Sequence, residues 1–95
     1  MSEPRIDVKL NTIWQTYGAS AQVKKLMEES YELAEAVNDY KADNSIGTDH
    51  ILEEAADVQV MLDQVCIGNN IDMARLNKVY TYKVDRQLAR IGADV

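Results

Sequence analysis

The sequence predicts an all-α protein, an antiparallel four-helix protomer that assembles with further copies into a helix-bundle oligomer. Three observations support this fold class. Apolar residues recur at three- and four-residue steps along most of the chain, which is the spacing of one helix face. Proline occurs once and glycine four times in 95 residues, so long uninterrupted helices are permitted. No run alternates apolar and polar residues for long enough to predict a strand.

The predicted helices cover residues 5–17, 20–42, 48–67 and 72–91, where the third begins at Thr48 or Asp49 because either is a good cap. Gly18 is a suitable C-terminal cap for the first helix, and Ser20 is a suitable N-cap for the second. The polar residues 43–47 form the loop that follows. Short connections place consecutive helices side by side, and the turn over residues 68–70 should fold the third and fourth helices into a hairpin.

Length and composition limit the organisation of the chain and its partners. A chain of 95 residues predicts one domain, over residues 1–95. A bundle this small cannot cover all its apolar helix faces, so we expect a homo-oligomer, with a tetramer favoured over a dimer. The formal net charge of −6 argues against nucleic-acid polymers and membranes as partners, because both need a positive surface. It is compatible with a small phosphate ligand held by metal ions and a few local cations.

The cysteine content and the first residues predict a cytoplasmic protein. Cys66 is the single cysteine and cannot build a disulfide framework, so a reducing compartment is the simplest setting. Residues 1–9 are charged and lack the apolar stretch of a secretory signal. No segment approaches the roughly 18 apolar residues that a membrane span requires.

Acidic residues fall on or beside the apolar face of the second and third predicted helices. Glu29 falls at the edge of the second helix's stripe, and Glu32 is its neighbour three residues on. Glu54 lies inside the third helix's stripe, with Asp57 at the border and His50 on the same face. The apolar stripe of the second helix is Leu26, Ser30, Leu33, Val37 and Tyr40, and that of the third is Ile51, Ala55, Val58, Met61, Leu62 and Val65.

The position of Glu54 predicts a bound cation. An ionised carboxylate on a core-facing stripe costs several kcal/mol unless it is paired or coordinates a cation. If the two helices pack together, the acidic groups converge and raise one another's pKa values. A hard divalent cation removes this conflict, and ligation by oxygen alone predicts Mg²⁺, with Mn²⁺ as a substitute.

The spacing of these acidic residues resembles the signature of a known family. Glu28-Glu29-x-x-Glu32 is followed, after 21 residues (54 − 32 − 1), by Glu54-x-x-Asp57. This double motif is similar to that of the MazG-type all-α nucleoside triphosphate pyrophosphohydrolases, and the resemblance covers about residues 14–91. The flanking segments that also resemble the family are residues 25–33, residues 53–58, Asn70-Ile71-Asp72 and Tyr82-Lys83-x-x-Arg86.

The resemblance implies a fold, a reaction and a set of ligands. Members of the family are helical dimers or tetramers that use Mg²⁺ to cleave a ribo- or deoxyribonucleoside triphosphate between its α and β phosphates. They release the monophosphate and pyrophosphate, and many are house-cleaning enzymes of the nucleotide pool. Carried over residue by residue, the metal ligands are Glu29, Glu32, Glu54 and Asp57. Glu28 and Glu54 are the candidate catalytic residues. Glu28 matches the first glutamate of the motif, and its expected role is to hold a second metal ion or the attacking water.

The substrate also needs contacts that carboxylates cannot supply. Lys83 and Arg86 are three residues apart on the fourth predicted helix, and Lys25 lies one turn before Glu29, so these are candidates for phosphate contact. Trp14 is a candidate for stacking on the base, with a core position as the alternative. Gln22 is a candidate for reading a base edge.

Two rival readings use the same helices. A ferritin-like di-iron protein requires Glu-x-x-His pairs, and the single histidine is not placed three residues after a glutamate. An acidic helical interaction module, such as a small adaptor or an antitoxin-like bundle, explains the charge and the amphipathic helices. It does not explain Glu54 in an apolar stripe.

Overall fold

The computed structural model describes residues 3–93, and within that range it contains helices and no strand. This confirms the predicted all-α class. Residues 1, 2, 94 and 95 of the predicted domain lie outside the described residues. The elements, in chain order, are α1 (Ile6–Tyr17), α2 (Ala19–Ala42), the 3₁₀ turn η1 (Asn44–Ile46), α3 (Asp49–Gly68) and α4 (Met73–Arg90).

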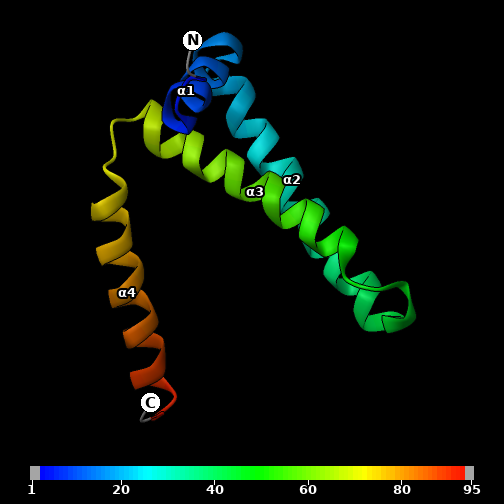
Figure 1. Ribbon diagram of the computed structural model, residues 1–95. Helices are drawn as coiled ribbons and strands as arrows, with labels where there is room; N and C mark the ends of the chain where they lie inside the picture. Colours follow the sequence, from blue (N-terminus) through cyan, green and yellow to red (C-terminus); the bar gives the residue numbers. More distant parts are fainter. Residues whose placement is uncertain (1–2, 94–95) are drawn as a thin grey trace.

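Helices α2 and α3 form a long antiparallel hairpin, which is the main body of the molecule (Figure 1). The predicted loop between them contains η1. Asp43 begins this turn by accepting hydrogen bonds from the Ser45 amide (3.1 Å) and hydroxyl (2.6 Å). The Ser45 hydroxyl, followed by the Ser45 amide, lowers the pKa of the Asp43 carboxyl.

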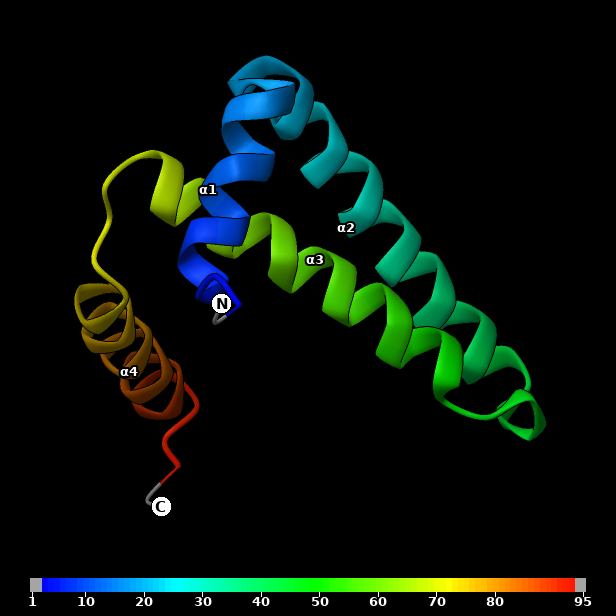
Figure 2. The same ribbon diagram turned by 45° about the horizontal axis from the view of Figure 1, so that its top comes forward.

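Helix α1 crosses the open end of the hairpin and closes a small core there (Figure 2). It turns into α2 through Gly18 alone, whose φ of 86° is left-handed and therefore favours glycine. Trp14 is buried where α1 meets the end of α3, and its indole lies so close to Gly68 that a Cβ there would overlap the ring. The buried apolar residues of the core are Leu10, Trp14, Ala36, Met61 and Cys66.

The buried face of α2 differs from the predicted one. Its buried residues are Gln22, Glu29 and Ala36, which recur every seven residues, whereas Ser30 and Val37 of the predicted stripe are exposed. The apolar pattern missed the centre of this face because two of its three buried residues are polar. Glu29 therefore lies at the middle of the interface with α3 and not at its edge.

Helix α4 stands apart from the other helices in both views (Figures 1 and 2). Within residues 3–93 the four predicted α-helices are present, but α4 does not pack along any other helix, so the predicted α3–α4 hairpin is wrong for this chain. The cause is the end of α3. Asn70 is left-handed (φ 58°), the Ile71 amide donates to Cys66 O (2.8 Å) and the Asn70 amide to Ile67 O (3.2 Å). This Schellman cap, followed by extended backbone at Asp72, directs α4 away.

The separation leaves α4 with an apolar face that nothing in the described chain covers. Every residue of α4 is at least partly exposed, and the large apolar side chains of this face are between 37% and 68% exposed. They are Met73, Leu76, Val79, Tyr80 and Val84. No helix in the described part of the chain has both the length and the apolar character needed to cross a membrane.

Candidate metal centre

Carboxylates from α2 and α3 meet in the middle of the hairpin. Glu29 comes from the buried face of α2, while Glu54 and Asp57 lie one turn apart on the facing side of α3. One carboxylate oxygen of each lies within 4.8 Å of the others, a group that could hold a metal ion. Glu29 is 6% exposed and the Glu54 side chain 13%, so two of these groups are largely withdrawn from water. The predicted convergence of these three residues is confirmed.

Glu32, the fourth predicted ligand, interacts with the same cluster from the solvent side. It is exposed, and its pKa is raised first by the charge of Glu29, then by partial desolvation and by Glu54. The pKa of Asp57 is raised first by desolvation and then by the charges of Glu29 and Glu54. Both shifts have the direction expected when carboxylates crowd together without a balancing cation.

Glu29 and Glu54 each have one oxygen paired and one unpaired. Lys25 Nζ lies 3.0 Å from Glu29 Oε1, and His50 Nε2 lies 3.1 Å from Glu54 Oε1. The hydrogen bond to Glu29, and then its charge, raise the pKa of Lys25. The Oε2 atoms of both glutamates are buried and find no hydrogen-bond partner among residues 3–93. Buried anionic oxygens without a partner are costly, and a cation bound between them would satisfy both.

A cavity of about 630 Å³ borders the cluster. Glu29 and Asp57 form part of its wall, and Glu28 lies on its exposed side. Deeper in the wall, Gln22 Nε2 donates a 2.8 Å hydrogen bond to Gln64 Oε1, and both side chains are buried. The other lining residues are Ile13, Tyr17, Ala21, Lys24, Lys25, Val60 and Met61. The cavity thus combines an apolar wall, an amide pair and cations beside the carboxylates.

The remaining predicted site residues divide into two groups. Gln22 and Lys25 line the cavity, as a substrate-contacting role requires. Trp14 is 7% exposed and packs against Gly68, so the structure places it in the core, which is the alternative to the predicted stacking role. Lys83 and Arg86 lie on α4, and the described chain does not bring them to the carboxylates, because α4 leaves the body after Asn70.

Arg86 nevertheless has an unusual environment within α4. Its guanidinium lies over the ring of Tyr82, 5.9 Å from the centroid, a cation–π contact along one helix. Its Nε is buried without a hydrogen-bond partner in the described part of the chain.

Among the cavity residues with a charged or amide side chain, two were not predicted from the sequence, Gln64 and Lys24. Gln64 lies seven residues after Asp57, just as Gln22 lies seven before Glu29, so each amide is two turns from a carboxylate on the same helix face. That spacing was a usable signal for Gln64. Lys24 also lines the cavity, and its only sequence signal is its place one turn before Glu28.

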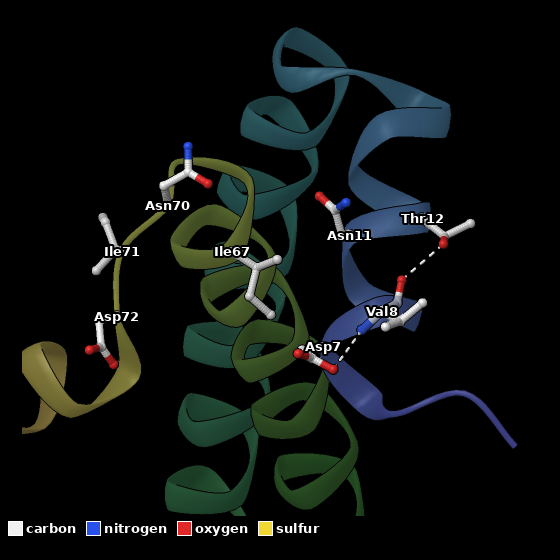
Figure 3. Close-up of a pocket in the computed structure, with 8 residues that line it drawn as sticks. All are labelled: Asp7, Val8, Asn11, Thr12, Ile67, Asn70, Ile71 and Asp72. Atoms are coloured by element: carbon white, nitrogen blue, oxygen red, sulfur yellow. Dashed lines mark hydrogen bonds between the residues drawn. The ribbon is translucent and has the colours of Figure 1, made fainter. Parts of the chain in front are cut away.

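A second cavity, of about 520 Å³, lies between α1 and the α3–α4 connection (Figure 3). Its acidic groups already have partners. Asp7 accepts a hydrogen bond from the Val8 amide (2.9 Å) and pairs with Arg5 (3.0 Å), while Asp72 accepts from the Ala74 amide (2.9 Å) and caps α4. Unlike the carboxylate cluster, this cavity has no buried side-chain atom without a hydrogen-bond partner among the residues that the structure describes.

Comparisons with protein families, curated proteins and solved structures find no match for this chain.

Proposed function

We propose that this chain is a Mg²⁺-dependent nucleoside triphosphate pyrophosphohydrolase that cleaves between the α and β phosphates of a ribo- or deoxyribonucleotide. The observation that carries the proposal is the pair of buried, unpartnered Oε2 atoms of Glu29 and Glu54 in the described chain, next to a cavity large enough for a nucleotide. The resemblance of the double acidic motif to the MazG-type enzymes supports the same reaction. Removal of unwanted nucleotides from the pool is the role that this reaction suggests.

The donor set suits a hard divalent cation. Glu29, Glu54 and Asp57 would hold it through oxygen, with Glu32 at the open side of the cluster. When bound, Mg²⁺ would neutralise negative charge on the triphosphate and on the leaving pyrophosphate.

The residues of the chain would supply the remaining parts. Glu28 lines the cavity without belonging to the Glu29–Glu54–Asp57 cluster, so it is the candidate to accept a proton from the attacking water. Lys24 and Lys25 supply positive charge on the same wall. Gln22, held by Gln64, would present its amide to a base edge while the apolar wall covers the rings.

The charge distribution supports a homo-oligomer, and the preference for a tetramer over a dimer rests on the small size of the chain alone. Helix α4 carries five basic residues and one acidic residue, a net charge of +4. The other residues together carry −10, because the whole chain carries −6. An 18-residue helix with an uncovered apolar face needs a partner surface to be stable in water, and the acidic body of a second copy is complementary in charge. Such docking would also bring Lys83 and Arg86 toward a neighbouring chain's carboxylates.

The deciding experiment is a panel of ribo- and deoxyribonucleoside triphosphates incubated with Mg²⁺, with pyrophosphate and orthophosphate measured separately. We expect pyrophosphate and the monophosphate as products, and orthophosphate alone would exclude the proposed cleavage position. Glu54→Gln should abolish turnover while the helical content stays unchanged. Glu53→Gln is the matched control, because Glu53 is adjacent but exposed and outside the cluster. Full activity of Glu54→Gln would contradict the metal assignment.

The alternative function is a non-enzymatic helical interaction module, an adaptor or antitoxin-like protein. The exposed apolar face of α4 is the observation in its favour. Thermal unfolding with and without Mg²⁺ and a non-hydrolysable nucleotide separates the two functions. A rise in the unfolding temperature with Mg²⁺ supports the enzyme, and the absence of any shift with either ligand supports the interaction module.

A further inference from the structure

The two glutamates of the cluster, Glu29 and Glu54, are held in the same way. In each helix, a residue one turn closer to the N-terminus donates to Oε1 and leaves Oε2 free: Lys25 to Glu29 on α2, and His50 to Glu54 on α3. Because each pair is spaced i, i+4, the helix backbone itself sets where the donor lies. The result is that both unpartnered Oε2 atoms of the described cluster are buried within the hairpin.

The contact between His50 and Glu54 needs no net charge on the histidine. An ionised carboxylate can only accept a hydrogen bond, so Nε2 of His50 must carry the hydrogen, and a neutral imidazole with its proton on Nε2 satisfies this. The His50 side chain is 60% exposed, whereas that of Glu54 is 13% exposed. His50 therefore lies at the rim, and it is not one of the three residues whose ligand atoms come together.

We propose that His50 is a positioning residue of the metal centre. By occupying Oε1, it fixes the orientation of the Glu54 carboxylate and keeps the buried Oε2 free for the cation. Without this contact, the Glu54 side chain is free to rotate away from the like charge of Glu29. The inference rests on the proposed metal site, and it adds a residue outside the double acidic motif to that site.

The physical expectation is a large effect on metal affinity and a small effect on folding. Partners that orient a metal ligand typically change affinity by about 10- to 100-fold when they are removed. Because His50 is exposed, we expect the lower end, about 10-fold weaker binding in His50→Ala. His50→Gln restores an N–H donor at the same helix position, and it should bind the metal more tightly than His50→Ala.

The test uses the full chain at one fixed pH with Mn²⁺ alone, with free Mn²⁺ followed by electron paramagnetic resonance. Gln59→Ala is the control, since Gln59 is exposed on the same helix and makes no side-chain hydrogen bond with the described residues. Each variant is also melted in EDTA. The proposal is supported if His50→Ala weakens Mn²⁺ binding, His50→Gln largely restores it, and neither variant nor the control changes the metal-free melting temperature.

Three other results would overturn it. Equal Mn²⁺ affinity in wild type and His50→Ala removes the role of His50 and leaves the metal site standing. Equal weakening in both His50 variants, together with a lower melting temperature in EDTA, indicates a structural role only. Absence of Mn²⁺ binding in the wild type overturns the metal site and the role of His50 together.

Discussion

Replacing Glu29 with glutamine should make the metal-free protein more stable while removing its response to Mg²⁺. Glu29 is the centre of the carboxylate cluster, because it is the most buried member and its charge raises the pKa of both Glu32 and Asp57. Glutamine keeps the volume of the side chain but removes the charge. Its amide can donate a hydrogen bond to the Glu54 carboxylate, so a repulsive contact becomes an attractive one.

The size of the effect follows from the distance between the carboxylates of Glu29 and Glu54. Their closest oxygens in the cluster lie within 4.8 Å, where two unit charges repel by about 3.5 kcal/mol at an effective dielectric constant of about 20, and by about 0.9 kcal/mol in bulk water. The lost ion pair with Lys25 is exposed on the lysine side and offsets little of this gain. We therefore expect a gain of about 1–3 kcal/mol, and each kcal/mol raises the Tm of a domain of this size by about 4–8 °C.

The assay is thermal unfolding followed by circular dichroism, in EDTA and in saturating MgCl₂. Wild type should gain about 2.7 kcal/mol when Mg²⁺ is present at 100 times its Kd, and Glu29→Gln should gain little or nothing. Glu35→Gln is the control, because Glu35 is an exposed residue of the same helix and should behave as wild type in both buffers. If Glu29→Gln melts below wild type in EDTA while Glu35→Gln does not, the carboxylates of the cluster do not destabilise the metal-free fold and the prediction is wrong.

Three further predictions address pH, the core and α4. The raised pKa values of Glu32 and Asp57 mean that the metal-free folded state holds their protons more tightly than the unfolded state does. The free energy of unfolding should therefore fall as the pH rises from the ordinary pKa range of carboxyl groups through the raised pKa values of these two residues. Urea unfolding over a pH series should show this loss of stability in EDTA but not with Mg²⁺. Gly68→Ala should lower the free energy of unfolding, because overlap with Trp14 costs about 1–3 kcal/mol while the helix preference of alanine returns about 0.5–1 kcal/mol. Adding Trp14→Phe to the same chain should reduce this loss. An unchanged Tm for Gly68→Ala would contradict the contact between Gly68 and Trp14. Leu76→Asp, in the exposed face of α4, should convert an oligomer into a monomer in light scattering with the helical body intact, and a monomeric wild type would refute assembly through this face.

The helices could be predicted from the sequence to within a residue or two, because their apolar spacing and their glycine and polar boundaries are local signals. The Glu29–Glu54–Asp57 cluster was also predictable, since an i, i+3 pair fixes two side chains on one face and Glu54 interrupts an apolar stripe. These features depend on the spacing of residues that are close in the sequence, and that spacing can be read from one sequence.

The remaining features depend on tertiary contacts. The centre of the α2 face is occupied by Gln22 and Glu29, and a pattern built on apolar residues cannot show that polar side chains are buried there. The course of α4 is set by the left-handed backbone of Asn70, which no periodicity encodes. Trp14 has the same aromatic side chain whether it stacks on a base or packs on Gly68, so only the fold separates the two roles.

The contact between Trp14 and Gly68 gives the molecule a built-in optical reporter. Trp14 is the only tryptophan, so the intrinsic fluorescence that it emits arises at one point, where α1 meets the end of α3. That point lies a few residues before Asn70, from which α4 departs, and away from the middle of the hairpin, where the carboxylates lie. A change in the Trp14 emission wavelength on dilution would thus report movement at the base of α4. A metal titration that leaves the emission unchanged would show that the carboxylate cluster and the base of α4 respond independently.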